Sequence, residues 1–169
     1  PYAVFTVTGA ANQLASLNLA NGTTAGLSGL QYYDATANSG TGGWVNYTAA
    51  TTVALDASGY LLVRTSLTPE QETAADNGET FTLTATNTGG SAAVGTGTVH
   101  DDGTGTYFPN TNPTNGSTPA TDPSHVMDDD RPLAVNSISV NEGSPYAVFT
   151  VTGAANQLAS LNLANGTTA

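Results

Sequence analysis

The chain has 169 residues and a one-sided charge: Asp and Glu total 13, Lys and Arg total 2, and the formal net charge is −11 at pH 7. With Arg64 and Arg131 as its only permanent cations, it offers no positive surface to the phosphates of nucleic acid or of an anionic membrane. No apolar run approaches the roughly 18 residues of a membrane span, so direct membrane insertion is not expected. The absence of cysteine excludes disulfide bonds and thiolate chemistry.

Alternation of apolar and polar residues predicts β-strands along most of the first hundred residues. The clearest case is 80–86, where threonines alternate with Phe81, Leu83 and Ala85. In chain order, strands are expected near residues 3–8, 16–19, 30–34, 44–48, 52–56, 60–66, 80–86, 92–100 and 134–140. Asn-Gly, Gly-Gly and Ser-Gly pairs supply the turns between them. About seven to nine short strands with little helix favour an all-β fold, a β-sandwich.

One segment departs from the alternating pattern. Thr68, Pro69 and Gln71 fit the N-cap, first position and capping-box position of a helix, and residues 76–78 (Asp-Asn-Gly) would end it. We expect one or two helical turns here, crossing between the two sheets.

Residues 106–132 differ in composition from the rest. They hold Pro109, Pro113, Pro119, Pro123 and Pro132, which are five of the eight prolines, and much of the remainder is Asn, Thr, Ser and Gly. This composition is typical of an extended connector between domains.

The chain repeats part of itself. Residues 145–169 are identical to residues 1–25, at an offset of 144 residues. We therefore expect the chain to be a window from a tandem array: a sandwich at 1–105 that lacks its first strand, a linker at 106–132, and the first strands of the next copy at 133–169. The strand expected at 134–140 has no counterpart before residue 1, so the two pieces are expected to complement each other by strand donation, within one chain or between neighbours.

The acidic residues cluster where strands are expected to end. The groups that we consider as metal ligands are Asp101 and Asp102; Asp128, Asp129 and Asp130; Glu142; Glu72, Asp76 and Glu79; and Asp34. Ca²⁺ takes six to eight oxygen ligands, and clustered carboxylates repel unless a cation neutralises them. Because Lys and Arg are nearly missing, a divalent cation is the natural partner. The alternative is that Asp-rich turns cap themselves and that the triple-Asp run is only solvated.

Catalysis is not expected. His100 lies beside Asp101 and Asp102, but no second histidine is near it in sequence, and Gly26–Gly29 lacks the spacing of a nucleophile elbow.

Three stretches together resemble the repeats of giant bacterial surface adhesins secreted by the type I (RTX) route: V-N-E-G-S-P-Y-A-V-F-T-V-T-G, E-T-F-T-L-T-A-T-N-T-G-G and D-D-G-T-G. The spacing of the acids around F-x-L also resembles Calx-β domains. The resemblance implies immunoglobulin-like Greek-key sandwiches, made rigid by calcium, which act as secreted, cell-surface extenders for an adhesive tip in surface attachment or biofilm formation. It implies calcium near Glu142, Asp101 and Asp102, and contact with neighbouring repeats.

Direct ligand binding is the alternative function. Carbohydrate would bind to a platform of aromatic residues, for which the candidates are Tyr32, Tyr33, Trp44 and Tyr47. Ice would bind to a flat array of exposed threonines, for which the candidates are Thr6, Thr8, Thr82, Thr84, Thr86, Thr96 and Thr98. The simpler interpretations are that the aromatics pack the core and that threonine is a preferred exposed strand residue.

Overall fold

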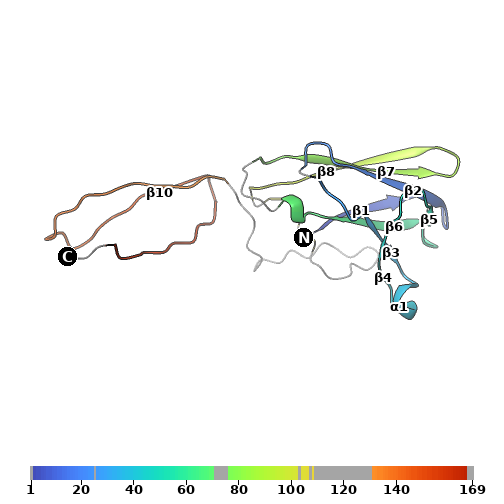
Figure 1. Cartoon of the computed structure of the whole chain (residues 1–169), viewed down its shortest axis with the longest axis horizontal. Helices are drawn as coiled ribbons and strands as arrows, with labels where there is room; N and C mark the ends of the chain where they lie inside the picture. Colours follow the sequence, from blue (N-terminus) through green and yellow to red (C-terminus); the bar gives the residue numbers. More distant parts are fainter. Residues whose placement is uncertain are drawn as a thin grey trace.

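The computed structural model describes residues 2–24, 26–70, 76–102, 104–106, 108 and 131–166. Residues 2–102 contain two antiparallel four-stranded sheets, which lie as two layers in Figure 1. We call this pair of sheets the two-sheet body. The all-β fold class predicted from the alternating pattern is confirmed.

The strand order is β1-β6-β3-β4 in sheet A and β5-β2-β7-β8 in sheet B. The strand bounds are β1 Tyr2–Thr8, β2 Leu14–Ala20, β3 Gln31–Asp34, β4 Gly43–Asn46, β5 Val53–Ala54, β6 Tyr60–Ser66, β7 Thr80–Asn87 and β8 Ala92–Thr98. All eight were predicted, with bounds that differ by at most two residues. The chain changes sheet at every consecutive pair of these strands except β3–β4 and β7–β8, so each sheet combines segments that are far apart in sequence.

The core lies between the two sheets. The ring of Phe81 in β7 is almost fully buried and meets the ring of Phe5 in β1 edge-on, with centroids 5.6 Å apart. Leu83 and Ala85 point the same way, because alternate residues of a strand share a face. The threonines between them are half-exposed on the outer face of sheet B.

The segment between β6 and β7 crosses from sheet A to sheet B. It begins with a single 3-10 turn, η1 (Thr68–Glu70), so the predicted helix start is confirmed, whereas residues 71–75 lie outside the described residues. A second short helix, α1 (Ala37–Gly40), was not predicted, and Asn38 and Ser39 within it have left-handed φ values of 53° and 60°. No helix in the described part of the chain is long and apolar enough to cross a membrane.

The second copy of the N-terminal sequence lies within residues 131–166, drawn in orange and red in Figure 1. Its described strands are β9 (Ala134–Val135) and β10 (Val151–Thr152), which pair antiparallel, with Val151 opposite Val135. By the offset of 144 residues, β10 corresponds to the last two residues of β1. The strand predicted at 134–140 is therefore confirmed for its first two residues, Ala134 and Val135. Most of the predicted linker, 106–132, lies outside the described residues.

The same sequence adopts the same turn in both copies. The side-chain oxygen of Gln13 accepts a hydrogen bond from Ala10 N at 2.9 Å, and that of Gln157 accepts one from Ala154 N at 3.0 Å. The burial differs, because Leu17 is 6% exposed whereas its twin Leu161 is 79% exposed. The turn is encoded locally, but the buried strands need the rest of a body to pack against.

Gly97 in β8 provides a test of the packing between the sheets. A Cβ atom at this position would lie 2.3 Å from Cζ of Phe81, which is too close for any contact. We expect Gly97→Ala to lower the free energy of unfolding by about 1–3 kcal/mol through overpacking, measured by thermal or urea denaturation. Thr96→Ala, one residue away on the outer face, should change it by less than about 0.5 kcal/mol. Equal effects of the two substitutions would contradict this packing.

Candidate functional site: an acidic pole at one end of the two-sheet body

One end of the body collects most of its described carboxylates. The crossing from β6 brings Glu70 to the beginning of β7, and Asp101 and Asp102 follow β8 at the same end. The ladder of β7 and β8 continues beyond the strands, because Gly78 N donates to Val99 O and Val99 N donates to Glu79 O. We call the group of Glu70, Asp76, Glu79, Asp101 and Asp102 the acidic pole.

Backbone and amide donors hold two of these acids in place. Asp76 N donates to Oδ2 of Asp101 at 3.1 Å, and Asp101 N donates to Oδ1 of Asn77 at 3.2 Å. Nδ2 of Asn77 also donates to Oδ2 of Asp102 at 3.2 Å. Asp101 is buried, at 9% exposure, so its carboxylate has lost most of its water and depends on such donors.

Asp102 forms a self-capping turn. Its Oδ1 accepts from Thr104 Oγ1 at 2.5 Å and from Thr104 N at 3.0 Å, and these bonds hold the pKa of Asp102 below its ordinary value. This is the local role that the alternative interpretation assigns to Asp-rich turns. The carboxylate oxygens of Asp102 thus already have partners inside the protein.

Glu70 and Glu79 form the electrostatically strained part of the pole. Glu70 is buried, at 7% exposure, on the first turn of the crossing. A hydrogen bond with the Glu70 side chain, together with desolvation and the nearby charges of Glu70 and Asp76, raises the pKa of Glu79 to about 7. Near neutral pH Glu79 is therefore protonated for part of the time, because adjacent carboxyl groups resist full ionisation.

Arg131, at the beginning of the second copy, contacts this pole. Its Nη2 donates to the backbone oxygen of Asp102 at 3.3 Å, and its own backbone oxygen accepts from Nε2 of Gln157. One of the two permanent cations of the chain therefore lies where the first copy meets the second. Sequence reasoning missed this position, since Arg131 is separated from Asp102 by the linker.

The predicted metal ligands are only partly brought together. Asp76, Glu79, Asp101 and Asp102 lie at the acidic pole, whereas Glu142 lies in an exposed turn in which Asn141 Oδ1 accepts from Gly143 N. Glu72, Asp128, Asp129 and Asp130 lie outside the described residues. In the described ranges, no three or more His, Cys, Asp or Glu side chains are arranged to hold a metal ion. Glu70 was not among the predicted ligands. Its position beside Pro69, at the predicted helix start, was the signal that it lies on the crossing between the sheets.

Asp34 lies away from the pole. The pairing of β3 with β6 places Gln31 opposite Arg64 and Tyr32 opposite Val63, so Asp34 lies toward the Tyr60 end of β6, whereas the acidic pole follows its Ser66 end. Its Oδ1 accepts from Thr36 N and Oγ1, both at 2.7 Å, and these bonds lower its pKa. Its role in the structure is to cap a turn.

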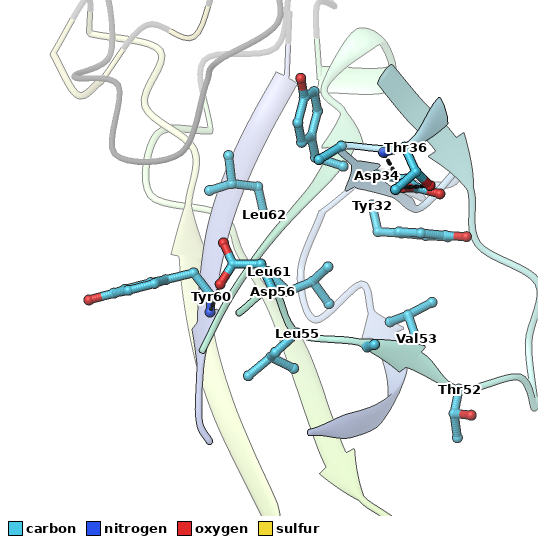
Figure 2. Close-up of a pocket in the computed structure, with 13 residues that line it drawn as sticks. Tyr32, Asp34, Thr36, Thr52, Val53, Leu55, Asp56, Tyr60, Leu61 and Leu62 are labelled. Carbon is cyan, nitrogen blue, oxygen red and sulfur yellow. Dashed lines mark hydrogen bonds between the residues drawn. The ribbon is translucent and has the colours of Figure 1, made fainter. Parts of the chain in front are cut away.

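A cleft of about 600 Å³ lies beside Asp34, between β3 and the segment of β5 and β6 (Figure 2). Asp56 is the other carboxylate that lines it, and Oδ1 of Asp56 accepts from Ser58 N at 2.8 Å and Tyr60 N at 2.9 Å. Both acids of the cleft thus serve local turns. The rest of the lining is largely aliphatic and aromatic, including Tyr32, Val53 and Leu55.

The four aromatic residues considered for a carbohydrate platform do not share one surface. Tyr32 and Tyr47 pack against the core, and the hydroxyl of Tyr47 accepts from Leu17 N and donates to Thr51 O. Tyr33 meets Trp44 edge-on instead, at 5.6 Å. The four-residue platform is therefore a wrong prediction, because adjacent strand residues such as Tyr32 and Tyr33 face opposite sides.

Arg64 lies across the outer face of sheet A. Its guanidinium carbon is 3.9 Å from the ring centroid of Tyr2 and 4.3 Å from that of Trp44, and its Nε donates to Oε1 of Gln31 at 2.7 Å. These residues come from all four strands of the sheet. Arg64 is only 8% exposed, and its burial lowers its pKa. The guanidinium therefore serves packing, not recognition of an anion.

Neither protein-family models, nor curated protein sequences, nor solved structures give a match to this chain.

The raised pKa of Glu79 predicts a pH dependence of stability. A carboxyl group whose folded pKa lies above its ordinary 4.5 stabilises the fold below that value, and the contribution is lost as pH rises through about 7. In EDTA, we expect the melting temperature to fall between about pH 5 and 8, and Glu79→Gln to reduce this slope. Glu142→Gln, which removes an exposed carboxylate, is the matched control and should leave the slope unchanged. An unaltered slope in Glu79→Gln would show that the carboxyl pair is not responsible.

Proposed function

We propose that the chain is part of a structural extender, a spacer built from tandem immunoglobulin-like Greek-key β-sandwiches. The observation that carries this proposal is the identical 25-residue sequence at an offset of 144 residues, since a protein that needed one binding or catalytic domain would have no use for a second identical start. The two-sheet body supports it, because strands β1, β6, β3 and β4 in one layer and β5, β2, β7 and β8 in the other suit a sandwich.

We propose that calcium makes the extender rigid at the acidic pole. The support is electrostatic: Glu70 and Glu79 share a hydrogen bond that requires a proton, and Asp76 raises the pKa of Glu79 further. A divalent cation would replace that proton and remove the repulsion. Arg131 contacts the pole from the beginning of the second copy, so an ion bound here would act at the junction between repeats. Further ligands would come from water or from Glu142 of another copy.

From the resemblance to adhesin repeats, we propose that this extender belongs to a secreted protein at a bacterial cell surface, where it would hold an adhesive tip away from the cell. Its partners would be calcium and neighbouring repeats. Catalysis forms no part of the proposal: His100 is the one described histidine, and the carboxylates of Asp34, Asp56 and Asp102 accept hydrogen bonds from their own turns.

The extender function predicts the shape of a longer chain. A protein with three successive copies of residues 1–144 should be an elongated rod in calcium, and its maximum dimension in small-angle X-ray scattering should grow linearly with copy number. EDTA should shorten the mean dimension by permitting bending, and should also lower the melting temperature, since an ion at a hundredfold excess over its Kd stabilises the folded state by about 2.7 kcal/mol.

Two outcomes of this experiment would count against separate parts of the proposal. Globular particles whose size does not grow linearly would overturn the extender. Linear growth with no response to EDTA, in scattering or in melting, would leave the extender in place and eliminate calcium. Magnesium at equal concentration is the control for ionic strength.

Ice binding is a second candidate, favoured by the outer face of sheet B. The pairing of β7 with β8 places Thr80 opposite Thr98 and Thr82 opposite Thr96, so the two strands form neighbouring threonine rows. Thr6 and Thr8 belong to β1 in sheet A and are not part of this array.

The threonine array predicts activity in an ice recrystallisation assay. If the array binds ice, the chain should inhibit recrystallisation, and replacing Thr82 and Thr96 together by lysine should abolish the effect by breaking the flat surface. The same replacement of Thr6 and Thr8 should leave it unchanged. Absence of inhibition by the unmodified chain would end this candidate.

A further inference from the structure

We propose that the outer edge of β1 is an acceptor site for a β-strand, and that residues 133–140 of another copy of this chain are the strand that fills it. This inference is independent of calcium and of the extender function. It assigns an interaction surface, a partner and a register.

The acceptor is an edge strand with a core behind it. Among the described residues, β1 pairs on one side with β6 over all seven of its residues and ends sheet A on the other side. Phe5 and Val7 pack against the core but remain only half-buried. An unpaired strand edge presents a row of backbone donors and acceptors, which is a template for another strand.

The second copy shows which strand fits this edge. There, β9 pairs antiparallel with β10, and the residues of β10 are the twins of Val7 and Thr8. Asn136 extends the pairing, because its N donates to Thr150 O at 3.2 Å and its Oδ1 accepts from Thr150 N at 2.6 Å.

The pairing of the second copy transfers directly to β1. By the same offset of 144 residues, Ala134 would lie opposite Thr8, Val135 opposite Val7, and Asn136 beside Thr6. Residues 134–136 of the proposed donor therefore already pair with this sequence, in a defined direction and register.

The donor gains from the exchange. In the second copy its ladder contains two residue pairs, and the apolar side chains near it are exposed: Leu133 at 46%, Val135 at 59% and Val151 at 39%. An isolated two-stranded ladder is marginally stable in water. On β1, Val135 would lie beside Val7 at the margin of an existing core. There its side chain would bury more apolar surface than it does in the second copy.

The donor has to come from another copy. Arg131 contacts Asp102 at the acidic pole, the end of the body at which β6 ends and β1 begins, whereas Ala134 would have to reach Thr8 at the other end of β1. Three residues span at most about 10 Å, whereas the seven residues of β1 extend over about 20 Å. The Arg131 contact therefore prevents a chain from filling its own edge, and a neighbouring chain or repeat supplies the strand.

Cysteine pairs test the register directly, because the chain has no cysteine of its own. Full-length chains with Thr8→Cys and with Ala134→Cys would be mixed under mild oxidation and run on a non-reducing gel. We expect a disulfide-linked heterodimer, formed about tenfold faster than with Thr98→Cys in place of Thr8→Cys, because pairing raises the effective concentration of the two thiols. Thr98 lies on β8, the exposed edge strand of sheet B, and is the matched control.

A second variant protects the test from misfolding at β1. Ala134→Cys combined with Thr152→Cys should form a disulfide within the chain, because these residues are opposite each other in the β9·β10 ladder. That disulfide would keep the donor strand paired with β10 of its own chain, while leaving β1 unchanged. Sedimentation velocity should show self-association of the unmodified chain that is lost in the locked chain and restored by a reductant.

Three results would overturn the proposal. The first is equal cross-linking of Ala134→Cys to positions 8 and 98. The second is a chain that stays monomeric at all concentrations. The third is an association that the lock does not affect, as would occur if residues 146–164 replaced residues 2–20 in another body instead of adding to its edge.

Discussion

Within the described two-sheet body, the strands that carry most of the core, β2, β6 and β7, each pair with a strand that lies far away in sequence. The clearest demonstration is the pair of identical sequences, because residues 2–20 pair with β6 and β7 and contribute Leu17 to the core, whereas Leu161 in the second copy remains 79% exposed. The difference cannot come from intrinsic strand propensity, which is the same for both. It comes from β6 and β7, which supply hydrogen-bond partners on one side and an apolar surface on the other.

The scarcity of positive charge organises the remainder of the molecule. Arg64 is used inside the body, between aromatic rings on the outer face of sheet A, and Arg131 contacts the acidic pole at the beginning of the second copy. The carboxylates divide into those that cap their own turns, such as Asp34 and Asp102, and the Glu70–Glu79 pair, in which the pKa of Glu79 is raised to about 7. The nearby carboxyl groups of Glu70 and Asp76 raise the pKa of Glu79, which is why the proposed cation is assigned to that end of the body.

Sequence reasoning located the strands well, because alternation such as that around Phe81 reports which face of a strand is buried. It expected the acids to gather where strands end; Asp76, Glu79, Asp101 and Asp102 do lie at one end of the body, whereas Glu142 lies in an exposed turn of the second copy. It was wrong to join Tyr32 and Tyr33 in one platform, and it missed that Asp34 lies at the far end, because the end at which a residue lies depends on the register of β3 against β6. It also could not place Arg131, whose contact crosses the linker.

The cluster around Arg64 has a spectroscopic consequence. Trp44 is the sole tryptophan of the chain, and its indole lies 4.3 Å from a guanidinium that also stacks on Tyr2, the first described residue of β1. Tyr146, the twin of Tyr2, is 79% exposed and has no such neighbour among its described surroundings. The emission of one fluorophore therefore reports whether an N-terminal strand is seated on sheet A. The folding of each repeat can therefore be followed by intrinsic tryptophan fluorescence, without any added label.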